Sequence, residues 1–518
     1  MAGPSGRRRA ERAVAAATLA GLAACTVGPD YVRPSAPAPV AYKEAWKPGP
    51  AMQGWRETRP ADGLDRGAWW SIYRDPVLDG LERQIDISNQ NLKAAEAAFR
   101  EAEATVAAAR AQFFPTAALN ASATRARSSG NSAPTAGFGG GISNRFATEA
   151  TASWVPDLWG SVRRAVESNV ASAQASAATL ANARLSAQGE LATAYLELRT
   201  ADELARLLDA SIKGYTEALR IVTNQYAGGT TDQSAVSQAE AQLDATRSQR
   251  IAVGVTRAQL EHSIAALIGK TPIEVTIAAT EGVIAVPLVP AEMPSALIER
   301  RPDIAAAERN MQAANAQIGV SVAAFYPDVT LSADYGVSAE MLRRLFTTSS
   351  RIWSLGSSAA ETVFDGGARN AQVEHDEAAY EASVATYRQA VLTAFQQVED
   401  ELASQHFLAE QAVAEDAALQ AAREAERVIN NQYLAGTQAY TAVIVAENTA
   451  LADAESSLNI RQSRLVASAA LIEALGGGWD STQLPSADTI ESNAPLDFNP
   501  LPPIFPTGSA GITPPLPK

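Results

Sequence analysis

Cysteine and histidine are scarce in this 518-residue sequence, and their scarcity excludes several classes of protein. The single cysteine, Cys25, cannot form an intramolecular disulfide. The three histidines, His262, His375 and His406, lie far apart and have no metal-ligand spacing such as HExxH. We therefore expect no metal site and no cofactor. We also expect no enzymatic activity, because no nucleotide-binding or nucleophile motif lies between a strand and a helix.

Positive charge and long apolar segments are also limited. The chain has 42 Lys and Arg residues against 57 Asp and Glu residues, so its net charge is 42 − 57 = −15 and nucleic acid is not an expected partner. Beyond the N-terminal segment there is no strongly apolar run of roughly 18 residues, so no transmembrane helix is predicted. A membrane β-barrel stays compatible with the sequence, because its signal is weak in each strand.

The N-terminus has the pattern of a secretion signal. Arginines within residues 7–12 precede a short apolar stretch at 13–24, so residues 1–24 are predicted to be a signal peptide. The sequence Leu-Ala-Ala-Cys that ends at Cys25 resembles a bacterial lipobox, in which the chain is cleaved before the cysteine and the thiol is acylated. The alternative is a chance cysteine after an ordinary cleavage site. Residues 25–65 are rich in Pro and Gly and are predicted to be an extended, acylated tether.

A seven-residue motif occurs twice and indicates an internal duplication. Residues 224–230 read NQYAGGT and residues 431–437 read NQYLAGT, with five of seven identical and an offset of 431 − 224 = 207. In both copies the motif lies between two long helical patterns. Glycine there can adopt the left-handed conformation that ends many helices, so each copy predicts the turn of a helical hairpin.

Each repeat combines two strands with a long helical hairpin. The first repeat, residues 66–280, is expected to contain one helix from Pro76 to about Gln112, then strands with alternating polarity. The second repeat, residues 281–479, follows the same plan, and the Pro-rich residues 480–518 are expected to be disordered. The predicted strands are at about 116–128, 143–156, 328–338 and 352–364, and the predicted hairpins at 161–268 and 368–475.

Four strands with one apolar face are too few to close a barrel within a bilayer, where every backbone group needs a hydrogen-bond partner. Three copies would supply 3 × 4 = 12 strands, which can close. The predicted fold class is therefore mainly α with four β-strands per chain, internally duplicated. As a trimer it would form a 12-stranded outer-membrane β-barrel continuous with a 12-helix periplasmic α-barrel.

Several motifs in a fixed order carry a resemblance to a known family. They include CTVGPDY from Cys25, WWxxYxDP from Trp69, RRPDI from Arg300, FDGG from Phe364 and both hairpin turns. Over about residues 20 to 480 the chain resembles the outer-membrane factors of tripartite efflux systems, of the TolC/OprM type. It fits best the lipoprotein branch, often labelled NodT-family.

The resemblance implies a homotrimer in the bacterial outer membrane, lipid-anchored and spanning, with a large periplasmic part. Such a duct would passively conduct small toxic or amphipathic compounds delivered by a periplasmic adaptor protein and an inner-membrane pump of the resistance–nodulation–division (RND) type. Two alternatives stay open. One is the same architecture serving secretion of protein or oligosaccharide, and the other is a coiled-coil scaffold lipoprotein of the envelope.

The resemblance also implies roles for the hairpin tips. The residues expected to dock the adaptor are Tyr226, Gly229, Thr230, Tyr433, Gly436 and Thr437. Turn geometry alone is the alternative reading of the Gly and Tyr residues. Known members carry acidic rings at the periplasmic gate, but the matching positions here are Ala442 and Val445, so the sequence leaves an acidic and a hydrophobic gate open. The gate candidates are Asp232, Tyr440, Val443, Val445 and Glu447.

Overall fold

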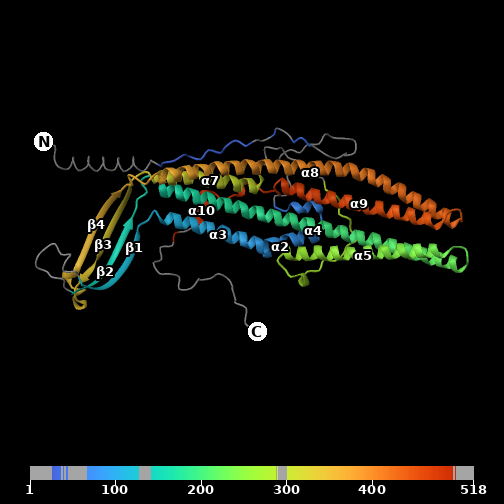
Figure 1. Ribbon diagram of the computed structural model, residues 1–518, viewed down its shortest axis with the longest axis horizontal. Helices are drawn as coiled ribbons and strands as arrows, with labels where there is room; N and C mark the ends of the chain where they lie inside the picture. The colour runs from blue at the N-terminus through green and yellow to red at the C-terminus, as the bar shows by residue number, and fades with distance from the viewer. Residues whose placement is uncertain are drawn as a thin grey trace.

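Segments of alternating polarity and segments of helical periodicity occupy opposite ends of one elongated molecule. The computed structural model describes residues 26–36, 39, 42–44, 67–127, 142–287, 289, 300–493 and 496, and the structural statements below concern these residues. A β-sheet forms one end, long helices extend away from it, and two hairpin tips form the other end (Figure 1).

The two halves of the chain build matching helices. Each half contains one helix of 22 residues, one of 67 and one of 35, which confirms the predicted duplication. At 1.5 Å per residue, the 67-residue helices are about 100 Å long. The first half has α3 (Gln90–Ala111), α4 (Ser161–Ala227) and α5 (Gln233–Leu267), and the second has α7 (Pro302–Ala323), α8 (Ala368–Leu434) and α9 (Tyr440–Ala474).

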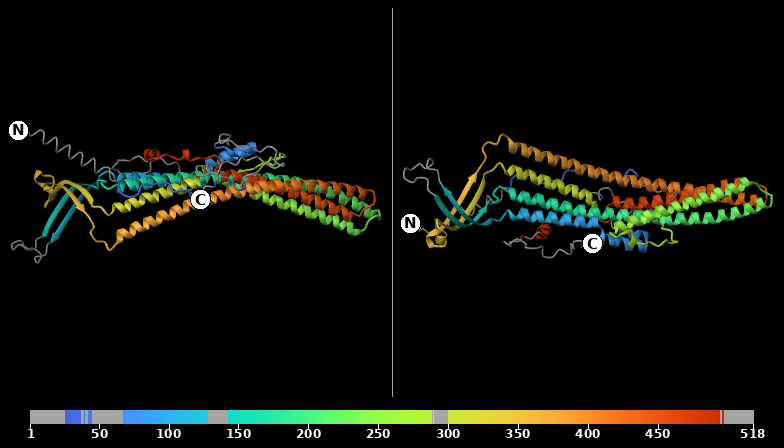
Figure 2. Two further views of the ribbon diagram at one scale, coloured as in Figure 1. Left: turned by 90° about the horizontal axis from the view of Figure 1, so that it is seen from above. Right: turned by 60° about the horizontal axis from the view of Figure 1, so that its bottom comes forward.

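The helices form one curved layer with two open edges. Helix α4 contacts α3 and α5 on one side and α7 and α9 on the other, and α8 packs beyond α7 and α9. Figure 2 shows α3 and α8 at opposite edges of this layer. Both edges expose large apolar side chains: Leu392, Phe407 and Val413 on α8, and Ile251 and Val255 on α5.

The short helices meet end to end. Where α5 ends near α3, Asn89 Nδ2 donates to the Leu267 carbonyl at 2.7 Å, and a Cβ added to Gly269 would lie only 2.0 Å from the Ser88 carbonyl oxygen. The second repeat reproduces this joint, because a Cβ on Gly476 would lie 2.0 Å from the carbonyl oxygen of Arg300. Glycine is required at both joints because another chain segment passes at contact distance.

The prediction of one continuous helix from Pro76 to about Gln112 is wrong. The chain forms α2 (Pro76–Ser88) and α3, with the extended backbone of Asn89 between them. The Asn89 side chain accepts a hydrogen bond from Leu92 N at 2.9 Å and thereby caps α3. Its amide also reaches α5, so this break is set by the joint between the two short helices.

The Trp-Trp motif anchors the largest buried cluster, near the middle of the helical layer. Trp69, in a 3₁₀ turn (η1, Trp69–Tyr73), is 1 % exposed, and the Tyr73 hydroxyl lies 2.8 Å from Ser468 Oγ on α9. Asp75 caps α2 and also accepts a 2.7 Å hydrogen bond from Tyr195 of α4. The motif therefore ties the start of the first repeat to both halves of the layer.

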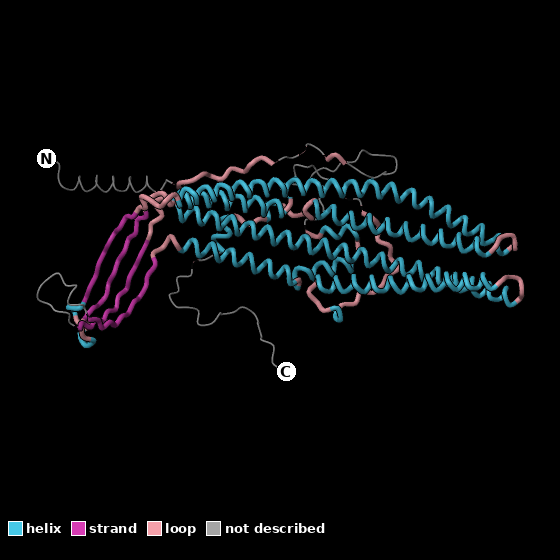
Figure 3. The backbone as a smooth tube through the Cα atoms, in the orientation of Figure 1, coloured by secondary structure: helices cyan, strands magenta, loops and turns pink. Residues whose placement is uncertain are grey.

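The sheet has four antiparallel strands in the order β1-β2-β3-β4, with bounds Thr116–Arg127, Ile142–Trp154, Asp328–Ala339 and Arg351–Ala360 (Figure 3). Leu119, Ala150, Tyr335 and Trp353 are consecutive partners across it and share one face. The other face is polar: Asn120 donates to Thr151 at 3.4 Å and Ser354 to Asp334 at 2.8 Å. The two faces predicted from alternation are therefore present.

Two segments differ from the sequence-based expectation at their ends. Strand β4 ends at Ala360 rather than near 364, because charged Glu361 follows and the chain then turns at Asp365 toward α8. Part of the C-terminal tail is ordered: it forms η5 (Ser481–Gln483) and α10 (Ala487–Asn493). Ile490 is fully buried against α3 and α4, which explains why this part of the tail packs.

The start of the expected tether is not free but bound along the helices. Arg164 of α4 holds it through Asp30 Oδ1 at 2.8 Å and the carbonyl of Gly28 at 3.3 Å. A Cβ on Gly28 would lie 2.5 Å from Cα of Gly319 on α7, so the two backbones touch. Further along, Arg33 pairs with Glu308 of α7 at 3.4 Å. Residues 26–36 therefore form a strap across α4 and α7.

Candidate functional site

The hairpin tips have the same backbone geometry in both repeats. At the first tip, Thr230 N donates to the Gln225 carbonyl and Gly229 N to the Tyr226 carbonyl, each at 2.9 Å. At the second, Thr437 N and Gly436 N make the equivalent bonds at the same length. Both glycines have φ of 75°, so each turn is a Schellman motif with glycine in the left-handed position.

Turn formation accounts for the glycine and threonine of each motif. The Thr230 hydroxyl donates to the Gln225 carbonyl at 2.9 Å, and Thr437 does the same with Gln432. All four residues are exposed, and a Cβ on Gly229 or Gly436 would meet no other group. The four residues are therefore accessible at the tips, and the two glycines are required for their backbone conformation.

The two tyrosines of the motif differ. Tyr226 is 45 % exposed at the first tip. Tyr433 is half-buried, packs against Tyr440 at a ring separation of 5.4 Å and donates to Gln225 Oε1 at 2.5 Å. This bond joins the second tip to the first. No sequence pattern indicated it, because both copies of the motif carry a glutamine at this place, Gln225 and Gln432.

The start of the return helix is capped at only one tip. Asp232 precedes α5, and its carboxylate accepts from Ser234 N at 2.9 Å and Ala235 N at 3.3 Å. These bonds, with that from the Ser234 hydroxyl first, lower the pKa of Asp232. The equivalent residue of the second tip is Ala439, which provides no side-chain cap. Asp232 is therefore the N-cap of α5, and its capping bonds account for an acidic residue at this position.

Two of the gate candidates lie inside the protomer. Tyr440 is 7 % and Val443 is 3 % exposed, and both pack in an apolar cluster between the two tips with Val222 and Val236. Both side chains are therefore enclosed within the protomer, whereas the third apolar gate candidate, Val445, lies on its surface. Val445 is 66 % exposed.

Val445 lies in a shallow groove between α8 and α9. The groove has a volume of about 470 Å³ and is lined mainly by small or apolar side chains. Small residues let the two helices approach closely while leaving this surface open. The lining residues are Ala422, Ala425, Ile429, Thr441, Ala442, Val445, Ala446 and Thr449.

Glu447 is a half-buried carboxylic acid close to the tips, and half-buried Glu426 of α8 lies near it. Its Oε2 atom has no hydrogen-bond partner among the described residues. Burial raises the pKa of Glu447 to about 7, and the charge of Glu426 on α8 acts in the same direction. Burial also raises the pKa of Tyr215 on α4 to about 12, with Glu447 adding to the effect. Glu447 therefore gains or loses a charge near neutral pH.

Three expectations from the sequence bear on regions away from the tips. Cys25, the predicted lipidation site, lies outside the described residues. No group of His, Cys, Asp or Glu side chains that could hold a metal ion occurs in the part of the chain that the structure describes. In the same part, none of the helices combines the length and apolar character needed to cross a bilayer.

Comparison with known proteins defines the class. The family model described as "Outer membrane efflux protein" matches residues 82–270 and 293–477. The chain therefore belongs to the outer membrane efflux protein family, and the predicted fold class and the resemblance to the outer-membrane factors of efflux systems are confirmed. It is an outer-membrane protein with a large periplasmic part, and its role is that of the exit duct of an efflux system.

Individual relatives cover most of the chain. It is 28 % identical to the solvent efflux pump outer membrane protein SrpC of Pseudomonas putida over 468 residues, which is 89 % of this chain and 97 % of the relative. It is 30 % identical to the pyoverdine export outer membrane protein OpmQ of Pseudomonas aeruginosa, over 81 % of this chain and 89 % of the relative. The solved outer-membrane channel OprN superimposes with a TM-score of 0.80 at 28 % identity, covering 88 % of this chain and all of that one.

The unequal caps predict unequal tip stabilities. Replacing Asp232 with Ala should make the first tip open more readily and reduce the protection of its return-helix amides several-fold, because two backbone N–H groups lose their acceptor. Replacing Ala439 with Asp should increase the protection at the second tip by a similar factor. Hydrogen exchange of the first amides of α5 and α9 measures both effects. Unchanged protection in both variants would contradict this account.

The stability of the tips should depend on pH through Glu447. The folded tip binds this proton more tightly than the unfolded chain, whose carboxyl titrates near the ordinary 4.5, so the tip loses stability as pH rises from about 4.5 to about 7. After allowance for solvent screening the loss should be about 1 kcal/mol.

Hydrogen exchange of α9 amides, corrected for intrinsic rates, should reveal this loss in the natural chain and not in Glu447→Gln. Glu240→Gln, which removes an exposed carboxylate from α5, is the matched control and should keep the pH dependence. An equal pH dependence in all three proteins would rule out Glu447 as its origin.

Proposed function

We propose that three copies of the chain close into one duct, and that the duct carries small toxic or amphipathic compounds from an inner-membrane pump of the RND type across the outer membrane. The observation that carries the proposal is the pair of open edges. Strands β1 and β4 each have one neighbour in the described sheet, and unpaired backbone groups within a bilayer cost several kcal/mol each. Three chains would give 3 × 4 = 12 strands, enough to close.

The helical layer supports the same closure. Its edges, α8 and the α3–α5 pair, expose apolar residues such as Phe407 and Ile251. Apolar surface of this kind on two different edges fits a head-to-tail ring, in which each copy covers the next. The polar face of the sheet would line the duct, and the face with Leu119 and Trp353 would contact lipid.

The nature of the cargo follows from the relatives rather than from the geometry. The names of several relatives refer to solvents, toluene, antibiotics and pyoverdine, all of which are small compounds or classes of them. Passive conduction of small compounds is therefore the favoured role. Passage of secreted protein or oligosaccharide is the outcome that would replace it.

The adaptor protein would dock at the two tips and in the groove beside Val445. Tyr226, Gly229, Thr230, Gly436 and Thr437 are exposed there, whereas Tyr433 serves mainly to join the tips. Val445 and Glu447 are the residues we propose for the gate. The start of α9 suits this role, because it lacks a side-chain cap and can therefore open more easily.

Two measurements test the proposed function: the oligomeric mass of the protein and the drug susceptibility of a strain that lacks it. Detergent-extracted protein, corrected for bound detergent, should have the mass of three chains, and a deletion strain should become more susceptible to solvents and amphipathic antibiotics. A monomeric mass would remove the duct. Unchanged susceptibility together with a missing secreted protein or polysaccharide would replace efflux by secretion.

We also propose that Cys25 carries the lipid. Thr26, the next residue, contacts Gly160 where a Cβ would lie 2.5 Å from its methyl group, and Val27 N donates to the Trp159 carbonyl at 3.2 Å. Gly160 directly precedes α4, at the junction of helices and sheet, so the strap begins where the inner face of the bilayer would be. An acyl chain at residue 25 could enter the bilayer without stretching the strap.

Replacing Cys25 with Ser should abolish the acyl mass in spectra of the intact protein, whereas Thr26→Ser should keep it. The trimer should persist in both variants, because the strap and the sheet are unchanged. Acyl mass on the Cys25→Ser protein would disprove the lipidation site.

A further inference from the structure

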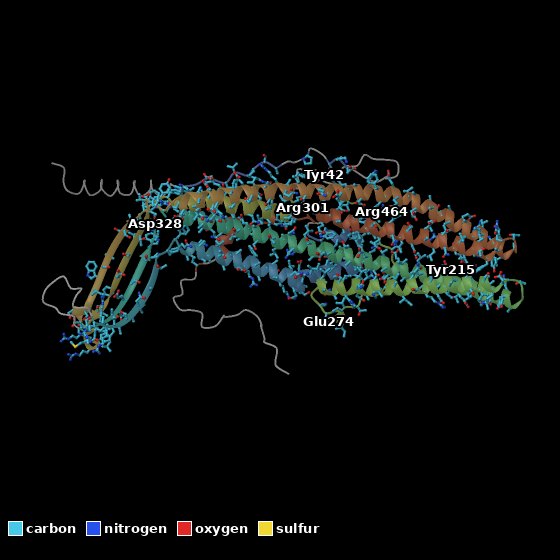
Figure 4. All side chains as sticks on the ribbon, viewed as in Figure 1. Tyr42, Tyr215, Glu274, Arg301, Asp328 and Arg464 are labelled. Atoms are coloured by element: carbon cyan, nitrogen blue, oxygen red, sulfur yellow. The ribbon has the colours of Figure 1, made fainter. Side chains whose placement is uncertain are left out.

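Charge is distributed very unevenly along the sheet. The distal end, away from the helices, carries six exposed arginines and one acidic residue, Glu340, so its charge is 6 − 1 = +5 in a chain whose net charge is −15. The connecting residues 128–141 add no charge. Nitrogen-tipped side chains gather at this end in Figure 4, while Asp328 marks the end near the helices. The six arginines are Arg125, Arg127, Arg145, Arg343, Arg344 and Arg351.

The strand register assigns three of these arginines to the apolar face. Arg125 and Arg127 share the face of Leu119 on β1, and Arg351 shares that of Trp353 on β4. Every other residue of this face on the four strands is uncharged, and the acidic strand residues Glu149, Asp328 and Asp334 all lie on the polar face. The three arginines are therefore the only charged residues of this face on the four described strands, and all three lie toward its distal end.

These three side chains have no ion-pair partner among the described residues, so their charge is available to a ligand. They also lie on the two edge strands, β1 and β4. In a closed ring β1 of one copy would lie beside β4 of the next, and the arginines would converge at each subunit boundary. A site of this kind exists only in the assembly.

We propose that Arg125 and Arg127 of one copy, with Arg351 of the next, bind the phosphate groups of the glycolipid in the outer leaflet of the membrane. The proposal rests on the closed ring proposed above. Arginine binds phosphate through paired N–H donors, and clusters of basic residues beside an apolar surface attract anionic lipid headgroups. The simple alternative is that each arginine extends into interfacial water without a specific ligand.

The test uses native mass spectrometry of the full-length, detergent-extracted protein with bisphosphorylated lipid A as the probe. The natural protein should retain lipid A, and Arg125→Gln/Arg127→Gln/Arg351→Gln should bind it at least about ten-fold more weakly, since three charge-assisted contacts are lost. The matched control is Arg220→Gln/Arg247→Gln/Arg427→Gln, which removes the same charge from exposed helix positions and should bind normally.

Two further binding measurements use the natural protein with other lipids, so their outcome does not depend on whether the triple variant assembles. Lipid A without phosphate and phosphatidylglycerol should each bind much more weakly than the bisphosphorylated form. Equal binding of the phosphate-free lipid, or equal losses in both triple variants, would overturn the site. Equal binding of phosphatidylglycerol would overturn the assignment to the outer leaflet. The same spectra give the oligomeric mass, so a failure of ring closure is seen separately from a failure of lipid binding.

Discussion

The need to satisfy the backbone groups at the two edges of a four-stranded sheet governs the whole molecule. The edge strand β1 follows directly on the edge helix α3, and the other edge strand, β4, leads into the other edge helix, α8. The open edges of sheet and helical layer are therefore continuous, and one head-to-tail arrangement of copies covers both. Hydrogen bonding drives closure within the bilayer, and burial of apolar side chains such as Phe407 drives it in the periplasm.

The duplicated chain must match helices of unequal length. A wall of helices about 100 Å long needs neighbours of equal length, but the return helix of each hairpin has 35 residues against 67 in the outgoing one. Stacking it on the 22-residue helix gives 35 + 22 = 57 residues, nearly the full length. The two joints at Gly269 and Gly476 are thus equivalent parts of one design, and each depends on a glycine that lets a second backbone pass at contact distance.

At the tips, the residues that form the turn can be distinguished from the residues that differ between the two repeats. The repeated Gly and Thr residues complete the same Schellman turn twice, so their repetition reflects a common backbone geometry. The differences between the tips are more informative. Asp232 caps one return helix and Ala439 leaves the other uncapped, Tyr433 joins the tips through Gln225, and Glu447 places an unpaired carboxyl near them. Because its return helix is uncapped and an unpaired carboxyl lies near it, the second tip should change conformation more easily than the first.

The sequence by itself determined the local elements, because alternation, proline placement and helix caps act over a few residues. Strand faces, the Asp75–Pro76 helix start and both hairpin turns followed from such patterns. Tertiary structure decided what depends on contacts far apart in the chain: the break at Asn89, which contacts Leu267, the burial of Tyr440 between the tips, and the docking of residues 26–36 through Arg164. No local pattern encodes these contacts, because each requires a partner more than 100 residues away.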